Sequence, residues 1–172
     1  MSLIVPCELP TSSMLLRYKH DGAYTDCYRT TLPQTVSLPG FIEAFYTTPL
    51  FRLERIILHW LVHKPSTDKT IRLVADNQAQ AFAAWQVERR DTEQILLADY
   101  RGRTRSWLMC TSSSDEDSAT TSLYFGSAVV AAGTGSTKRN PLSTTVKLML
   151  PFHRLYSRAL LWSARRRLRK SI

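Results

Sequence analysis

The chain has 172 residues, 44 % of them apolar, and carries 23 Lys and Arg side chains against 14 Asp and Glu. This length and composition fit one globular domain and exclude a disordered chain. All 14 acidic residues lie before residue 118, whereas residues 118–172 hold ten basic and no acidic residues, which excludes an evenly cationic, histone-like protein.

The chain begins with a segment in which apolar residues show no clear periodicity, and it continues into a predicted strand. Residues 1–22 contain Pro6, Pro10 and a Thr-Ser-Ser run, which predict an irregular lead-in. No basic stretch with a long apolar run stands at the start, so we expect no signal peptide and a cytoplasmic protein. From Tyr24 to Leu32, β-favouring residues precede Pro33, which predicts the first strand.

Three helices are predicted next. Phe41 to Tyr46 is typical of a short helix, and apolar residues at three- or four-residue intervals predict a second, amphipathic helix from about Pro49 to His63. The run Pro65-Ser66-Thr67-Asp68 ends that helix and offers a cap for a third, which extends to about Ala75.

Four strands are predicted in succession: Gln80–Arg89, Glu93–Tyr100, Arg103–Ser112 and Ala119–Ala132. The segments between them are short and polar, which favours an antiparallel meander. The glycine-rich run from residue 133 to residue 138 lacks the spacing of a phosphate-binding loop, so we predict a connector.

The register of this meander predicts a candidate binding face. If Asp91-Thr92 and Arg101-Gly102 are two-residue turns, two cross-strand rows share one face. One row holds Trp85, Ala98 and Arg105, and the other holds Val87, Leu96 and Trp107. This face predicts a pocket with walls from Trp85 and Trp107 and with Arg105 as the cation for an acidic headgroup. The alternative is that the arginine lies at the sheet rim or pairs with a carboxylate.

The last segment, from about Leu142 to Lys170, is predicted to be helical, with a kink or a break at Pro151. On a helical wheel, five basic residues form a stripe that we expect to face outward: Lys147, Arg154, Arg158, Arg165 and Arg169. A second sector is expected to pack on the sheet: Leu148, Phe152, Leu155, Tyr156 and Ala159.

The basic end of this helix holds candidate contacts to an anionic surface. These residues are Arg165, Arg166, Arg167, Arg169 and Lys170. One interpretation is a solvated face that ends in a frayed tail. The other is attachment to anionic lipid headgroups, because a basic amphipathic helix with Trp162 near its end fits a membrane interface. No nucleic-acid-binding motif accompanies the charge, so we do not expect a nucleic-acid partner.

Other chemistry-bearing patterns are weak. Cys7, Cys27 and Cys110 lack the spacing of zinc ligands, and we expect reduced thiols. His59 and His63 have the spacing of a helical metal pair, but the chain contains no His-Glu-x-x-His motif. We therefore expect no metal and no cofactor, and no sequence motif assigns a catalytic residue.

The order strand, helices, meander, C-terminal helix predicts an α+β domain in which an antiparallel sheet wraps around the long C-terminal helix. We divide the chain into the irregular lead-in (1–22), a single domain (23–165) and a basic tail (166–172). The oligomeric state stays open.

Three segments resemble a bacterial family of unknown function that is similar to helix-grip proteins, the START and polyketide-cyclase-like superfamily. They are Asp99–Leu108, Leu123–Val130 and Pro151–Tyr156, and the Pro-Phe-His-Arg run of the third is the most specific. The resemblance covers residues 24–165. It implies a curved antiparallel sheet around a long C-terminal helix and singles out His153.

Candidate ligand contacts are therefore Trp85, Arg105, Trp107, His153 and Tyr156. The leading hypothesis is a domain that binds an apolar or amphipathic small molecule, with an acidic ligand as one option, between the sheet and the C-terminal helix. A cyclase- or hydratase-like enzyme with His153 as acid or base is a second hypothesis. A peripheral membrane or partner-docking protein that uses the basic helix is a third.

Overall fold

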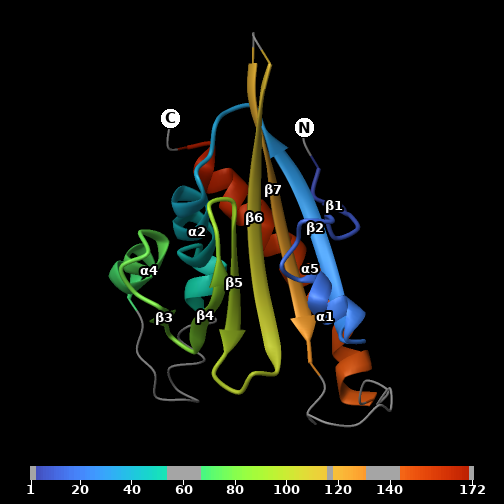
Figure 1. Ribbon diagram of the computed structural model, residues 1–172. Coiled ribbons are helices and arrows are strands. Elements are labelled where there is room, and N and C mark those ends of the chain that lie inside the picture. Colours follow the sequence, from blue (N-terminus) through green and yellow to red (C-terminus); the bar gives the residue numbers. More distant parts are fainter. Residues whose placement is uncertain (1–2, 54–66, 116–117, 131–143, 171–172) are drawn as a thin grey trace.

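A computed structural model describes residues 3–53, 67–115, 118–130 and 144–170. Its centre is an open antiparallel sheet, which in these ranges has seven strands in the order β1-β2-β7-β6-β5-β4-β3 (Figure 1). The strands are β1 (Val5–Pro6), β2 (Tyr24–Leu32), β3 (Ala81–Phe82), β4 (Trp85–Arg90), β5 (Gln94–Asp99), β6 (Thr104–Asp115) and β7 (Ser118–Val129). Strands β3 to β7 form a meander, and β2 joins it by pairing with β7.

Four helices have both ends in the described ranges: α1 (Leu16–His20), α2 (Leu38–Tyr46), α4 (Asp68–Ala75) and α5 (Thr144–Leu168). Helix α2 starts earlier than the sequence predicted, because Ser37 caps it and a proline occupies its first turn. The side chain of Thr67 caps α4, which confirms the predicted third helix. The predicted second helix is helical from residue 49 to residue 53, and the rest of it lies outside the described residues.

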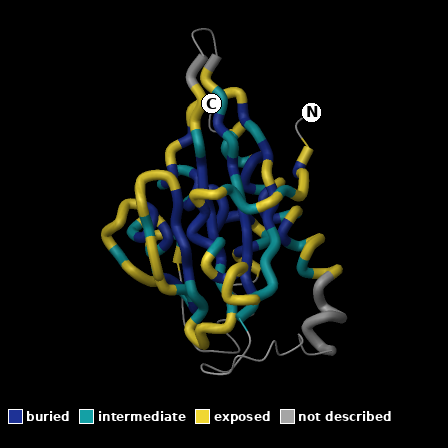
Figure 2. Tube along the Cα trace, turned by 45° about the vertical axis from the view of Figure 1, so that its right-hand side comes forward, coloured by how far each residue is buried: buried dark blue, intermediate teal, exposed yellow. Residues whose placement is uncertain are grey.

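The sheet separates two apolar clusters. On one face, α2, α4 and α5 cover the larger cluster, in which Phe41, Phe45 and Leu161 are fully or almost fully buried. On the other face, the N-terminal segment packs Leu15 and other apolar side chains against Trp107. The expected irregular lead-in is thus in part ordered structure, with β1 and α1, and it covers one side of the sheet. Buried residues follow the middle of the molecule, while turns and outer segments are exposed (Figure 2).

The register of the meander is partly as predicted. Leu96 pairs with Trp107 and Ala98 pairs with Arg105, as expected from a short turn between β5 and β6. The predicted rows in β4 are wrong, because a bulge between Val87 and Arg89 shifts the pairing by one residue. Trp85 is opposite Asp99, and Val87 is opposite Leu97, so both face away from Trp107 and Arg105.

The predicted strand Gln80–Arg89 is also two strands rather than one. Ala83 has a φ of 48°, which is left-handed backbone and ends an extended strand. Ala81 pairs with Gln86 and Phe82 with Trp85, so β3 folds back on β4 as a tight hairpin. This turn brings Trp85 to the face that is covered by the helices.

Helix α5 continues through Pro151 and is not divided there. Its buried side is made by Ser157, Leu160, Leu161, Ala164 and Arg165. The predicted packing sector is wrong at Phe152 and Leu155, which are 67 % and 66 % exposed, whereas Tyr156 packs against the core as predicted. The helix has two apolar stripes, and the one with the smaller residues packs against α2 and β2. The predicted outward stripe is wrong at Arg165, which is 8 % exposed.

None of the helices in the described ranges combines the length and the apolar character needed to cross a bilayer.

Candidate functional site

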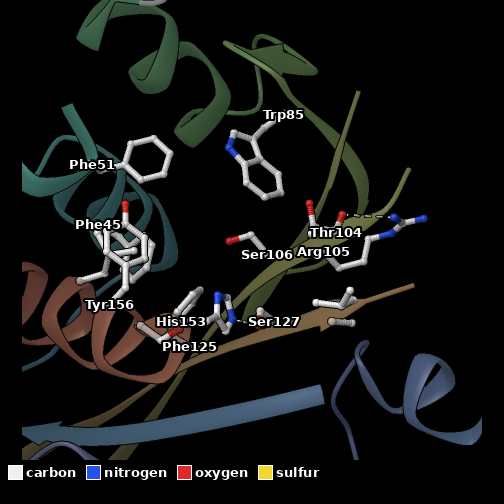
Figure 3. A pocket seen from close by; sticks show the side chains of 14 residues that line it. Phe45, Phe51, Trp85, Thr104, Arg105, Ser106, Phe125, Ser127, His153 and Tyr156 are labelled. Carbon is white, nitrogen blue, oxygen red and sulfur yellow. Dashed lines mark hydrogen bonds between the residues drawn. The ribbon is translucent and has the colours of Figure 1, made fainter. Parts of the chain in front are cut away.

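A cavity of about 210 Å³ lies between the sheet and helices α2 and α5 (Figure 3). Its walls are mostly apolar, with Phe45, Phe51, Trp85, Phe125, Tyr156 and Leu160. Polar side chains enter it from β6, β7 and α5, namely Ser106, Ser127, His153 and Ser157. An apolar cavity with a few convergent polar groups is the usual form of a small-molecule site.

The polar end of the cavity is a chain of three residues from three elements. Asp26 on β2 pairs in register with Ser127 on β7, and its Oδ1 accepts the Ser127 backbone N–H at 3.1 Å and hydroxyl at 2.6 Å. The Ser127 Oγ lies 2.8 Å from Nε2 of His153 on α5. Oδ2 of Asp26 lies 3.5 Å from the same nitrogen. This Asp26–Ser127–His153 chain ties α5 to the two strands.

The hydrogen bonds assign the protons in this chain. The carboxylate of Asp26 is acceptor only, and its side chain is 7 % exposed, so Ser127 donates its hydroxyl proton to Asp26. The Ser127 oxygen must then accept the Nε2–H of His153. The second ring nitrogen, Nδ1, lies on the side of the ring away from Ser127 and toward the cavity (Figure 3). The Asp26–Ser127–His153 hydrogen bonds therefore leave Nδ1 directed toward a ligand in the cavity.

The arrangement differs from the Ser-His-Asp triad of hydrolases. In a triad, the carboxylate holds one ring nitrogen and the serine hydroxyl gives its proton to the other. Here Asp26 and Ser127 lie at the same nitrogen, and the hydroxyl proton points to the carboxylate. Ser127 therefore orients His153 and is not set up as a nucleophile.

Further polar atoms line the cavity wall. Ser106 Oγ and Tyr46 Oη share a buried hydrogen bond of 2.7 Å. Within the described ranges, the buried Nε1 of Trp85 and Oγ of Ser157 have no hydrogen-bond partner. Both residues line the cavity. A buried polar atom without a partner costs free energy, so these two atoms favour a ligand that offers them a partner.

Four of the five predicted ligand contacts line the cavity, namely Trp85, Arg105, His153 and Tyr156. Trp107 lies across the sheet in the second cluster, where its Nε1 donates to Gln94 at 2.9 Å. Arg105 forms part of the wall, but its side chain extends away from the cavity centre (Figure 3).

The Arg105 side chain has partners on the face covered by the N-terminal segment. Its Nε donates to Glu88 at 2.5 Å and to the Tyr18 hydroxyl at 2.8 Å, and its guanidinium lies 4.8 Å from the Tyr18 ring centroid. Tyr18 also donates to Glu88. Burial, followed by the hydrogen bond to Glu88, raises the pKa of Tyr18. Arg105 therefore does not place the predicted cation in the cavity.

The predicted anionic-surface residues are divided between interior and surface. Arg165 is buried and donates to the Thr31 carbonyl at 3.3 Å, and burial lowers its pKa. Arg167 donates to the Thr47 carbonyl at 2.9 Å. The other three, Arg166, Arg169 and Lys170, are exposed.

Sequence reasoning missed Asp26, Ser127 and Ser106. The one local signal was a carboxylate, Asp26, in the middle of a predicted strand, where acidic residues are depleted. Ser127 and Ser106 had no such signal, since serine is ordinary on a strand. In the described ranges, no three His, Cys, Asp or Glu side chains gather in a way that could hold a metal ion.

No protein-family model matches the chain, and neither the curated proteins nor the solved structures compared with it give a match.

Proposed function

We propose that this chain binds a small, mostly apolar molecule with one hydroxyl or carboxylic acid group in the cavity between the sheet and α5. The observation that carries the proposal is the Nδ1 of His153, which the Asp26–Ser127–His153 chain holds toward an apolar-walled space. With only Nε2 protonated, Nδ1 accepts a hydrogen bond from a ligand hydroxyl, and when the ring is doubly protonated Nδ1–H donates to a ligand carboxylate.

The cavity volume limits the ligand. Its 210 Å³ is below the range of about 300–1,000 Å³ that is usual for drug-sized ligands. An apolar cavity of about 150 Å³ holds benzene. We therefore expect a molecule with a single ring or a short acyl chain, with its apolar part among Phe45, Phe51 and Trp85.

The resemblance to helix-grip proteins supports the same proposal. The resemblance implies a sheet wrapped around a C-terminal helix. Here the antiparallel sheet and α5 are two walls of the cavity. The ligand class follows from the residues in those walls and not from the resemblance, since one fold serves many functions.

The test is a titration with toluene, benzyl alcohol and benzoic acid, which share one ring and differ in the polar group. Binding is followed by tryptophan fluorescence. The Trp85→Phe variant shows whether Trp85 is the residue whose fluorescence changes. We expect saturable binding, tighter for the alcohol or the acid than for toluene. The two polar ligands separate a hydroxyl site from a carboxylic acid site.

His153→Leu is the decisive variant for the polar contact. It is expected to weaken binding of the preferred polar ligand about tenfold, the value of one hydrogen bond, and to leave toluene unaffected. His20→Leu, at an exposed position far from the cavity, is the matched control. The proposal fails if none of the three ligands gives saturable binding, or if His153→Leu binds all three with unchanged affinity.

A cyclase- or hydratase-like enzyme is the second candidate, and the same Nδ1 favours it. A general base needs an unprotonated nitrogen within reach of the substrate and a partner that orients the ring. Ligand that co-purifies with the protein can be identified by native mass spectrometry and incubated with fresh protein. Turnover that His153→Leu abolishes would favour the enzyme, and an unchanged ligand would favour the binding domain.

A further inference from the structure

The outer side of α5 exposes large apolar side chains, which no described part of the chain covers. Phe152, Leu155 and Trp162 are 67 %, 66 % and 50 % exposed. At about 100° per residue, these three positions lie within about 80° of one another around the helix. The opposite side of α5 carries the buried Leu160, Leu161 and Ala164. The exposed residues therefore form a second apolar stripe, which packs against no other element in the described ranges.

Exposed basic residues share this stripe. Arg158, Arg166 and Arg169 lie in the same sector, which spans about 120°. The guanidinium of Arg166 lies 5.5 Å from the centroid of the Trp162 ring. No Asp or Glu follows residue 117 in the sequence. We call these six residues, Phe152, Leu155, Arg158, Trp162, Arg166 and Arg169, the α5 outer face.

The positive charge of the α5 outer face favours an anionic binding partner over a second copy of the chain. A second copy of the chain docked by the same face would bring its arginines against one another with no carboxylate from the helix to offset them, and like charges repel. An anionic occupant is attracted instead. The apolar groups project from the outer side of the helix, as in helices that lie in a bilayer interface with their basic side chains at the headgroups.

We propose that the α5 outer face docks this protein on an anionic lipid bilayer. Phe152, Leu155 and Trp162 insert at the boundary between headgroups and acyl chains, and Arg158, Arg166 and Arg169 bind lipid phosphates. From Phe152 to Arg169 the helix is about 25 Å long, so it lies along the surface and presents both kinds of side chain together.

The test is co-sedimentation of the full chain with vesicles of phosphatidylcholine and with vesicles of equal parts phosphatidylcholine and phosphatidylglycerol. We expect binding to the anionic vesicles, weaker binding at high salt, and little binding to the neutral ones. A blue shift of Trp162 fluorescence on binding, absent in Trp162→Phe, would locate the contact.

Paired variants test whether vesicle binding depends on the α5 outer face or is non-specific adsorption. Arg158→Gln/Arg166→Gln is expected to weaken anionic-vesicle binding about thirtyfold, whereas Arg89→Gln/Arg103→Gln removes two exposed charges from the sheet and has little effect. Leu155→Ser is expected to weaken binding, and Leu3→Ser, at a residue that is 73 % exposed, is its control.

Three outcomes would overturn the proposal. They are no binding to anionic vesicles, binding that the α5 variants leave unchanged, and a dimer in sedimentation velocity that Leu155→Ser dissociates, which would assign the face to a second copy. Melting curves of each variant show that the fold is kept. The cavity titration uses different residues, so either proposal can fail alone.

Discussion

Ser127 and His153, on β7 and α5, are joined by a hydrogen bond of 2.8 Å at the polar end of the cavity. Because Ser127 also donates to Asp26 on β2, one side chain links a helix to two strands that are far apart in the sequence. The bond therefore has two roles: it sets the orientation of the imidazole, and it holds the helix on the sheet.

The first prediction concerns the structural role of this bond. Ser127→Ala is expected to lower the free energy of unfolding by about 1–3 kcal/mol, because Asp26 loses a donor and Nε2 of His153 loses an acceptor in a partly buried site. Urea denaturation measures the change. Ser113→Ala, at an exposed position on β6, is the control and is expected to stay within about 0.5 kcal/mol of the wild type. Equal effects of the two variants would contradict the assignment.

The second prediction concerns Gln94, which attaches the N-terminal segment to the sheet. Its Oε1 accepts from Trp107 Nε1 at 2.9 Å and from the Met14 backbone N–H at 3.0 Å, and its Nε2 donates to the Ser12 carbonyl at 3.0 Å. Gln94→Leu leaves two buried N–H groups without an acceptor and is expected to cost about 2–4 kcal/mol in unfolding free energy. Limited proteolysis before Tyr18 should also be faster.

A double-mutant cycle tests the cause of that loss. Trp107→Phe removes the indole N–H, so Gln94→Leu/Trp107→Phe is expected to cost less than the sum of the two single changes, with a coupling of about 0.5–3 kcal/mol. Additive costs would show that the contact between Gln94 and Trp107 does not stabilise the fold.

Periodicity and turn chemistry predicted much of the fold. Strand β2 has the predicted bounds, α4 follows its predicted cap, and the pairing of Leu96 with Trp107 followed from a short turn. The bulge near Val87 was not predictable, because one extra residue in a strand leaves the alternation nearly intact. The orientation of α5 was missed because two apolar stripes satisfied the same helical period.

Only those residues of the candidate site that lie in one segment of the sequence were predictable. His153 and Tyr156 lie one turn apart on α5, and the resemblance pointed to that run. Asp26 and Ser127 are 101 residues apart and meet through the pairing of β2 with β7. That pairing is long-range, and nothing in either strand alone indicates its partner. Trp107 was predicted to line the pocket because the predicted β4 register placed Trp85 on the same face, whereas the bulge places Trp85 on the opposite face.

The third prediction concerns the reactivity of the cysteines. Sγ of Cys7 and Sγ of Cys27 are 3.2 Å apart. The hydrogen bond between the two thiols lowers the pKa of Cys7 and outweighs the effect of burial, and Arg29 acts in the same direction. Burial raises the pKa of Cys110 to about 11. Since the thiolate is the nucleophile, iodoacetamide is expected to label Cys7 first, below the pH at which Cys110 reacts.

Timed labelling with peptide mass spectrometry measures this order. Cys27→Ala removes the hydrogen bond, so the labelling of Cys7 should need a higher pH than in the wild type. Cys110→Ala is the control and should leave the pH profile of Cys7 unchanged. A Cys7 profile that Cys27→Ala does not move would show that the hydrogen bond has no effect on the thiolate.

The last prediction concerns Gly126, beside Ser127 on β7. A Cβ at this position would lie 2.8 Å from the Asp26 carbonyl oxygen and 3.0 Å from Cε3 of Trp107. The first neighbour is backbone and the second is a fully buried ring, so neither can move cheaply.

Gly126→Ala is therefore expected to lower the free energy of unfolding by about 1–3 kcal/mol and to push β2 away from β7. Because Asp26 moves with β2, the same variant should also weaken ligand binding in the cavity. Gly40→Ala is the control, since its Cβ would meet only the Ser37 Oγ, at 3.3 Å. Urea denaturation and the cavity titration measure both effects. Equal stability losses at the two glycines would contradict the close approach of β2 to Gly126.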